Sequence, residues 1–417
     1  MCADRLAAVE TGPGPAAQAR ARSAAPPEPR LRGHLPALDG VRGLAILAVL
    51  LLHFVANTTP TNRLEEIASR TLSYGVLGVD LFFVLSGFLI TGILYDARYD
   101  PSYFKNFYMR RVLRIFPLYY AVLVLVFLVV PRLPFLEGSQ LATLREHQAW
   151  GWLYGINVYI WTQGGWPNNY IQHFWSLAVE EHFYFVWPLV VWLLASRPRA
   201  LLVTCLAVAG MSVAGRVVAS LLGAAPVPIS VLTPFQLDAL CLGGFFAVLA
   251  RQPGGAAKLK AAILPMAAGA AGVLVLTFVF NRFTDFGFVV LRPLRGAMLR
   301  VLLATILLHA LMAAPTSLVS RFFRSNTMIF LGKYSYGLYV YHHFLSFYLV
   351  RHGTEFALAR AVGSHTLAIA LQAGAGIAAS IAIAWLSYEA FEKRFLQLKS
   401  IFSPASARPG RKAAING

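Results

Sequence analysis

The stretch that decides the fold is VRGLAILAVLLLHFV, residues 41–55, which is apolar throughout except at Arg42, Gly43 and His53. With its neighbours, residues 36–56, it is long enough to cross a bilayer as a helix. Arg42 and His53 are almost three helical turns apart, which predicts that they share one face, with His53 about 16 Å further along the axis. Ionisable groups within a membrane are functional-site candidates, since burying one unpaired costs several kcal/mol. Alternatively, His53 lies at the outer interface, bonded to water or to a neighbouring helix.

The whole chain is as apolar as this segment suggests. Of its 417 residues 58% are hydrophobic and only 13% are charged, and the mean hydropathy is +0.61. These values exclude a soluble domain and predict an all-α, polytopic integral membrane protein with about ten transmembrane helices. The ten predicted spans are residues 36–56, 72–95, 115–131, 174–195, 199–222, 232–250, 260–281, 293–314, 327–350 and 366–390.

The strong positive charge is explained by topology. The net charge is +18, but the basic residues lie between apolar segments and not on one soluble patch, so no nucleic-acid partner is expected. Placing both termini in the cytoplasm puts most of the 36 Lys and Arg residues inside, as the positive-inside rule requires. We therefore expect a multi-pass protein of the cell inner (plasma) membrane, in contact with membrane lipids.

The expected organisation is a single membrane domain between two tails. Residues 1–34 predict a disordered basic cytoplasmic tail, 35–396 the membrane domain, and 397–417 a second disordered cytoplasmic tail. Residues 132–173 form the largest outer segment, and their Gly, Pro and aromatic content suggests a partly re-entrant or interfacial stretch.

Asp80 stands in the second span, within GVDLFFVLSG, residues 78–87. A carboxyl group among such neighbours needs a partner. The second span runs antiparallel to the first, so Asp80 and His53 fall at comparable depth. This predicts an Asp80–His53 pair in which the carboxylate fixes the imidazole tautomer. The alternative is that Asp80 caps or bonds a neighbouring backbone.

Three arginines, Arg110, Arg111 and Arg114, precede the third span and are called the arginine cluster below. Arg111 and Arg114 share a helical face at spacing i, i+3. Guanidinium groups there can hold phosphates with paired hydrogen bonds. Basic residues beside a span can equally be topology signals without a ligand.

The fourth span opens with HFWSLAVEEHFY, residues 173–184. Glu180 and Glu181 are about 100° apart on a helix, so at most one is expected to face a given cavity squarely. The alternative is an interfacial helix start, with acids favoured by the helix dipole. A second polar and aromatic stretch, KYSYGLYVYHH at residues 333–343, is interpreted as packing. No zinc spacing, phosphate loop or Gly-x-Ser-x-Gly elbow occurs, and no metal site is expected.

Five short motifs, in order, resemble the membrane acyltransferase 3 family. They are residues 38–45 with His53, residues 78–87, the arginine cluster, residues 175–181 and residues 339–342. The resemblance covers residues 36 to about 396. It implies a ten-helix membrane domain that moves an acyl group, commonly acetyl from acetyl-CoA, onto a sugar hydroxyl.

The resemblance also implies residue roles. His53 matches the family's histidine and would be the catalytic base, beside Arg42. The arginine cluster matches the basic group expected near the CoA phosphates, and Glu180 matches the acid of the Ser-Leu-x-x-Glu motif. His182 stands where a glutamine is more usual.

The expected function is therefore a membrane O-acyltransferase that uses cytoplasmic acyl-CoA as donor and an envelope, exported or lipid-linked carbohydrate as acceptor. His53, oriented by Asp80 or Glu180, would act as general base while Arg42 and the arginine cluster hold the nucleotide. Direct transfer and an acyl-histidine intermediate both remain open. A transporter or flippase of lipid-linked glycans is the competing class, since it too needs many spans and buried charges.

Overall fold

The computed structural model describes residues 33–132, 145–167, 169–280 and 286–402. All regular secondary structure in this part is helical, which confirms the predicted all-α class. The predicted N-terminal tail, apart from its last two residues, and residues 403–417 lie outside the described ranges. The longer helices are α2 (Pro36–Leu51), α3 (Arg63–Leu72), α4 (Leu77–Asp96), α5 (Tyr103–Val124), α9 (Trp175–Leu193), α10 (Pro198–Leu221), α12 (Leu237–Leu249), α13 (Gly255–Phe280), α14 (Phe286–Met312), α16 (Asn326–Arg351), α17 (Thr354–Val362) and α18 (His365–Ser387).

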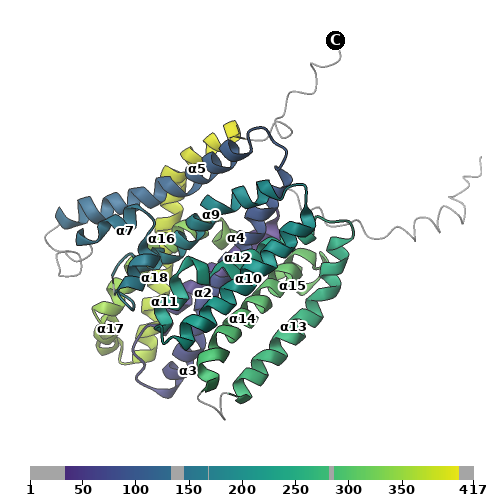
Figure 1. Cartoon of the computed structure of the whole chain (residues 1–417). Coiled ribbons are helices and arrows are strands. Elements are labelled where there is room, and N and C mark those ends of the chain that lie inside the picture. Colours follow the sequence, from purple (N-terminus) through teal and green to yellow (C-terminus); the bar gives the residue numbers. More distant parts are fainter. Residues whose placement is uncertain (1–32, 133–144, 168, 281–285, 403–417) are drawn as a thin grey trace, which may run out of the picture.

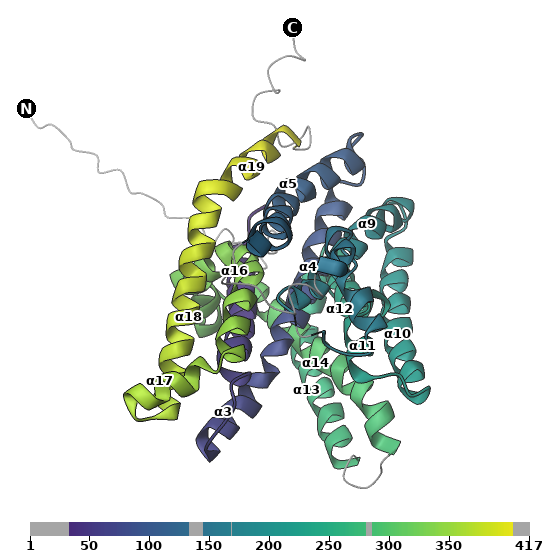
Figure 2. The same cartoon turned by 90° about the vertical axis from the view of Figure 1, so that its left-hand side faces the viewer.

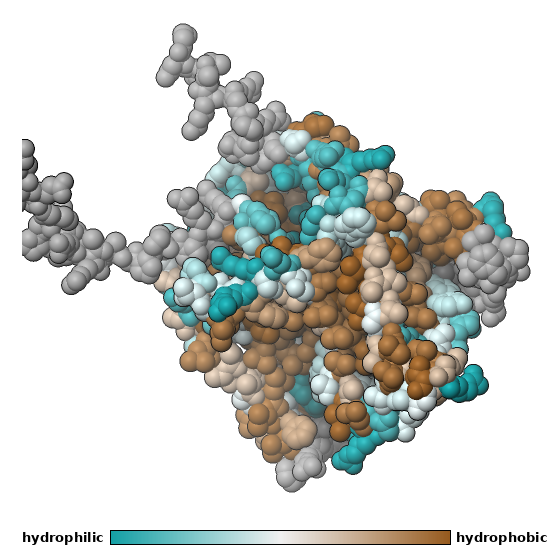
Figure 3. All heavy atoms as spheres, turned by 180° about the vertical axis from the view of Figure 1, so that it is seen from behind, coloured by the Kyte–Doolittle hydropathy of each residue, from teal (hydrophilic) through white to brown (hydrophobic). Residues whose placement is uncertain are grey.

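Seven helical stretches in the described residues are long and apolar enough to cross a membrane. They are Pro36–Ala56, Arg63–Asp96, Tyr103–Val129, Pro198–Leu221, Gly255–Phe280, Leu291–Met312 and His365–Phe402. The other three predicted spans form α9, α12 and α16; α12 has only 13 residues, and the other two carry many polar side chains. The chain is a multi-pass membrane protein, and the count of ten spans is not confirmed. Figure 3 shows hydrophobic residues gathered in a broad band over one face, with hydrophilic ones towards its edges.

The helices α2 and α4 run through the middle of the molecule (Figure 1). α2 packs on α16 and α4, and α4 packs on α12 and α9. Close approach needs residues without a Cβ: at Gly332 such an atom would lie 1.9 Å from the Asp39 carbonyl oxygen, and at Gly87 it would lie 1.8 Å from that of Leu240. Small residues at both contacts therefore let the backbones touch, as is common between membrane helices.

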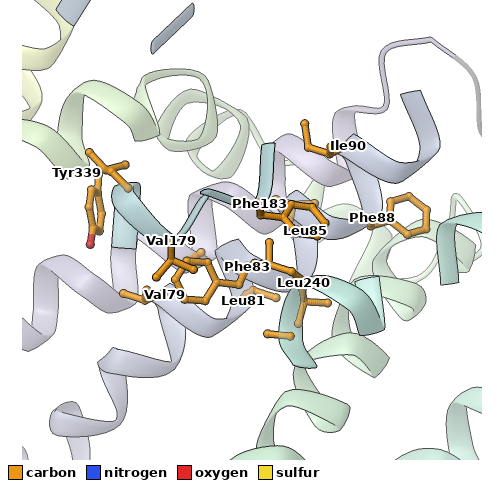
Figure 4. Packing of buried hydrophobic residues seen from close by; sticks show 14 of the residues in the cluster. Val79, Leu81, Phe83, Leu85, Phe88, Ile90, Val179, Phe183, Leu240 and Tyr339 are labelled. Atoms are coloured by element: carbon orange, nitrogen blue, oxygen red, sulfur yellow. The ribbon is translucent and has the colours of Figure 1, made fainter. Parts of the chain in front are cut away.

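Part of the apolar core lies where α4 meets α9 and α12. Val79, Phe83 and Leu85 of α4 lie against Val179 of α9 and Leu240 of α12 (Figure 4). All are buried. This packing holds α4 and α9 in a fixed relation, which positions the polar residues that both helices carry.

Figure 2 shows α5 and α19 (Lys393–Gln397) together at one end of the molecule, with α3 and α17 at the other. The chain continues from α19 into a 3-10 helix, Leu398–Phe402, that packs against α5. Residues 397–402 had been predicted to belong to a disordered tail. Their packing on α5 explains why they are helical instead.

The predicted outer segment 132–173 contains two short helices, α7 (Gln148–Trp152) and α8 (Ile156–Thr162). Residues 133–144 and 168 of this segment lie outside the described ranges. The Tyr154 ring stacks on Tyr119 of α5 with centroids 4.0 Å apart, and the Tyr119 hydroxyl donates to the Gly151 carbonyl at 2.7 Å. The part around α7 and Tyr154 is thus packed against α5, whereas α8 packs against α9.

Candidate active site

A cavity of about 640 Å³ lies between α2, α4, α5, α9 and α16. It brings together the residues that the sequence singled out at three separate places, because Arg42, the arginine cluster and Glu180 all line it. A smaller neighbouring cavity of about 260 Å³ shares Arg42 and Arg114 with it. His53 and Asp80 line neither cavity.

Basic side chains dominate the cavity. Arg42 bonds Asp39 at 2.7 Å, whereas the arginine cluster makes no ion pair with a carboxylate within the described residues. Arg111 stands over the Tyr184 ring at 5.6 Å. Guanidinium groups that lack a protein carboxylate and converge on one cavity form an anion site, and they suit phosphate because they can donate paired hydrogen bonds.

Glu180 and Glu181 of α9 both line the cavity. The cavity is wide enough to receive two side chains that leave the helix about 100° apart. Glu180 lies next to Ser86 and Tyr184 and near Arg111. One oxygen of Glu181 is buried without a hydrogen-bond partner in the described part of the chain. The expectation that only one acid faces the cavity is therefore too strict.

Tyr339 and Ser176 close the cavity on the side of α16. The Tyr339 hydroxyl donates to the His173 carbonyl at 3.0 Å and lies 2.5 Å from Ser176 Oγ. In Figure 4 Tyr339 stands at the edge of the apolar cluster on α4. Its ring centroid is 5.5 Å from that of His342, so the next group beyond the cavity wall is an imidazole.

Behind Tyr339 is a cluster of four imidazoles, His53, His173, His342 and His343, called the histidine cluster below. The His53 ring is 4.9 Å from His342 and 5.2 Å from His343, and the His173 ring is 4.6 Å from His343. Among the described residues no group of three His, Cys, Asp or Glu side chains is arranged to hold a metal ion. The cluster is thus a set of titratable nitrogens beside the cavity.

Hydrogen bonds to the backbone fix the tautomers of two of these rings. His53 Nδ1 is 3.0 Å from the Val49 carbonyl oxygen, and His342 Nδ1 is 2.8 Å from that of Tyr339. A carbonyl only accepts, so each Nδ1 carries the hydrogen and each Nε2 keeps a lone pair when the ring is neutral. His53 therefore has the form that a general base needs.

The position of His53 differs from the prediction in one respect. It lies in a π-helical turn, Leu52–Ala56, in which the Asn57 amide donates to the Leu52 carbonyl at 3.1 Å. Arg42 lines the cavity, while His53, about three turns further along the same helical stretch, lies beyond Tyr339, so the two do not share one cavity wall.

The predicted Asp80–His53 pair is wrong. Asp80 accepts a hydrogen bond from Arg300 at 2.8 Å, and Arg300 also bonds Asp238, which in turn pairs with Arg216 at 2.5 Å. Two cations and two carboxylates from α4, α10, α12 and α14 thus neutralise one another away from the cavity. The predicted catalytic role of Asp80 loses its geometric basis, because its carboxylate is engaged by Arg300.

The profile of an acyltransferase domain matches residues 35–389. The chain belongs to the acyltransferase 3 family. Because the match covers the cavity's helices and the histidine cluster, the site described above lies within the family's domain. No solved structure matches the chain.

Curated relatives carry names that concern O-acetyl transfer. The peptidoglycan O-acetyltransferase OatA of Listeria monocytogenes is 29% identical over 75% of this chain and 49% of its own length. The O-acetyltransferase OatA of Staphylococcus aureus is 29% identical over 74% of this chain and 50% of its own. The putative peptidoglycan O-acetyltransferase YrhL of Bacillus subtilis is 29% identical over 74% and 48%. This chain spans about half the length of these relatives.

Several residues of the site escaped sequence interpretation. His342 and His343 had been interpreted as packing residues of a polar and aromatic stretch, although His342 also ends one of the five family motifs, and His173 had been weighed only as part of a polar helix start. The signal that His173 and His343 carried was an imidazole within or beside an apolar span. Lys399 also lines the cavity, although it follows the last predicted span.

Proposed function

We propose that this membrane protein transfers an acyl group, acetyl in the first instance, from cytoplasmic acyl-CoA to a hydroxyl of a cell-envelope carbohydrate. The observation that carries the proposal is the cavity itself. Its arginine cluster makes no ion pair with a carboxylate of the described residues, and its inner wall at Tyr339 adjoins the histidine cluster. An anionic donor with a reactive thioester at its far end fits such a site.

The donor would enter with its nucleotide towards Arg42 and the arginine cluster. Charge-assisted hydrogen bonds from guanidinium groups to phosphate would hold that end. The long, thin pantetheine arm would follow the cavity towards Tyr339 and Ser176. These two side chains stand between the cavity and the histidines, so the thioester reaches His53 only past them.

His53 would act as the general base. Its Nε2 removes the proton of a sugar hydroxyl as that oxygen attacks the thioester carbonyl; the C–S bond then breaks, and the proton passes from the imidazolium to the departing CoA thiolate. General-base catalysis of this kind contributes about 10² to 10⁴ in rate. Attack by His53 itself, giving an acyl-histidine, is the chemical alternative.

Glu180 would act at the donor end of the site and would not orient His53. It lies in the cavity near Arg111 and Arg114, beside Tyr184 and Ser86. A carboxylate there attracts the arginines electrostatically without an ion-pair contact and sets the charge that the donor meets. Asp80, engaged by Arg300, would stabilise the helix packing and take no part in the reaction.

The proposed orientation places the α5 and α19 end in the cytoplasm of the inner (plasma) membrane and the acceptor on the opposite side. The names of the relatives suggest peptidoglycan as the first acceptor to test, with other envelope, exported or lipid-linked glycans after it.

The decisive experiment uses the full chain in nanodiscs with acetyl-CoA labelled in the acetyl group. Transfer of label to a glycan, or its release as acetate when no acceptor is present, is expected for the wild type and not for His53→Ala. A wild-type protein that binds no acetyl-CoA and releases no label contradicts the proposal. Mass spectrometry of envelope glycans from a deletion strain would identify the acceptor.

A further inference from the structure

One basic group of the cavity comes from outside the acyltransferase domain. The family profile ends at residue 389, whereas Lys399 belongs to the 3-10 helix Leu398–Phe402 that follows α19. This helix packs against α5, which carries the arginine cluster. The packing brings the Lys399 side chain to the cavity wall, where it is partly buried.

Lys399 differs from a nearby lysine in its surroundings. Lys393, on α19, donates to Glu389 at 2.9 Å and lies on an exposed surface. Lys399 makes no ion pair with a carboxylate of the described ranges. The charged groups that act on it electrostatically are cationic instead, namely Arg114, Arg111, Arg110 and Arg42.

This arrangement is unfavourable without a ligand. Basic side chains in the cavity outnumber carboxylates by five to three; they are Arg42, Arg110, Arg111, Arg114 and Lys399 against Asp39, Glu180 and Glu181. Like charges that converge at a partly buried site repel one another. A lysine has a flexible stem and could turn to water, but the 3-10 helix holds it against α5. An anion with several charges would convert the repulsion into binding energy.

We propose that Lys399 is a ligand for a phosphate group of the acyl donor, so that the segment after the acyltransferase domain completes the donor site. This inference rests on the proposed function and extends it to a residue beyond the family domain. The nucleotide end of CoA carries a pyrophosphate and a further 3′-phosphate, which supply the charge. The phosphate of an anionic lipid headgroup shares this chemistry and is separated from CoA by the test.

The test compares CoA with pantetheine, which lacks every phosphate, as ligands of the full chain in phosphatidylcholine nanodiscs. Calorimetry should show that Lys399→Met weakens CoA binding about tenfold, the value of one charge-assisted hydrogen bond, and leaves pantetheine binding unchanged. The salt dependence of CoA binding should also become shallower. Lys399→Arg should retain most of the affinity, and the control Lys393→Met should match the wild type.

Three outcomes overturn the inference. If Lys399→Met leaves the affinity for CoA unchanged, Lys399 does not contact CoA. If the variant weakens the binding of CoA and pantetheine equally, Lys399 serves packing and does not bind phosphate. A Lys399→Met effect that is confined to nanodiscs with anionic lipid assigns the phosphate to a headgroup.

If Arg111→Ala weakens CoA binding and Lys399→Met does not, only the inference fails. If the wild type binds no CoA, the proposed donor fails together with it.

Discussion

His53, in the turn that ends α2, and His342 of α16 stand edge to face, with 4.9 Å between the ring centroids. Both rings direct Nδ1–H to a backbone carbonyl of their own helix. The Nε2 of His342 is buried and has no hydrogen-bond partner among the described residues. A buried acceptor without a donor costs free energy, so it points to a group that arrives with a proton to give, such as a hydroxyl.

We predict that His53→Ala lowers acyl transfer by about 10² to 10⁴ and leaves expression near the wild-type level. The side chain is only partly buried and contacts other imidazoles, so its loss removes a base without emptying a packed core. Transfer of labelled acetyl by the purified variant gives the measurement.

The matched control for this variant is His352→Ala, because His352 is exposed at the end of α16 and lies outside the histidine cluster. It should transfer acetyl groups at the wild-type rate. A folded His53→Ala protein with wild-type turnover would remove His53 from the mechanism.

Arg42→Ala should weaken acyl-CoA binding by about tenfold to a hundredfold, since one lost charge-assisted hydrogen bond removes roughly 1.5 to 3 kcal/mol. The double variant Arg110→Ala with Arg111→Ala, which loses two such bonds, should weaken binding further. The loss should be largest at low salt, because ions screen these contacts. Calorimetry at two salt concentrations is the measurement. Arg70→Ala is the control, since Arg70 pairs with Glu66 on the exposed face of α3. Unchanged affinity would reduce the arginines to topology signals.

Sequence patterns predicted what depends on composition and on spacing along one helix. Each of the ten apolar segments is mainly helical in its described part, and Arg111 and Arg114, placed on one face by their spacing, line the same cavity. These features follow from hydropathy and from helical geometry, which are local properties.

Pairings between distant helices could not be predicted in the same way. The requirement that Asp80 has a partner was correct. Comparable depth in the membrane favoured His53 as that partner, but the packing of α14 against α4 brings Arg300 to Asp80 instead. The π-helical turn at His53 cannot be predicted from the hydropathy pattern, because an α-helix of the same residues would have the same hydropathy. Lys399 reaches the cavity only because a short helix folds back on α5. Each of these depends on tertiary packing.

The ionic network of Asp80 yields a stability prediction. Asp80→Asn should lower the free energy of unfolding by about 1 to 3 kcal/mol, because Arg300 keeps Asp238 as a partner. Arg300→Met should cost more, about 3 to 5 kcal/mol, since it leaves Asp80 without its cation. Thermal unfolding in detergent should therefore rank the wild type above Asp80→Asn and Arg300→Met lowest.

The same variants test whether Asp80 has a catalytic role. Donor binding and transfer per folded molecule should be close to wild type in Asp80→Asn. If Asp80→Asn unfolds at the wild-type temperature but has lost acyl transfer, Asp80 takes part in the reaction.

The sidedness of the molecule can be tested in the full chain with a membrane-impermeant maleimide. Ser102, between α4 and α5, and His352, between α16 and α17, are exposed at opposite ends, and the free cysteines Cys205 and Cys241 are buried. In a Cys2→Ser background, Ser102→Cys should be labelled only after the cells are opened, whereas His352→Cys should be labelled in intact cells or spheroplasts. The reason is that the arginine cluster follows Ser102, and basic loops stay in the cytoplasm.

Labelling of both sites from the same side would mean that the helices between them cross the membrane differently from the prediction. The reverse pattern would open the arginine-lined cavity to the outside, where acyl-CoA is not expected, and would remove the physical basis for the proposed donor.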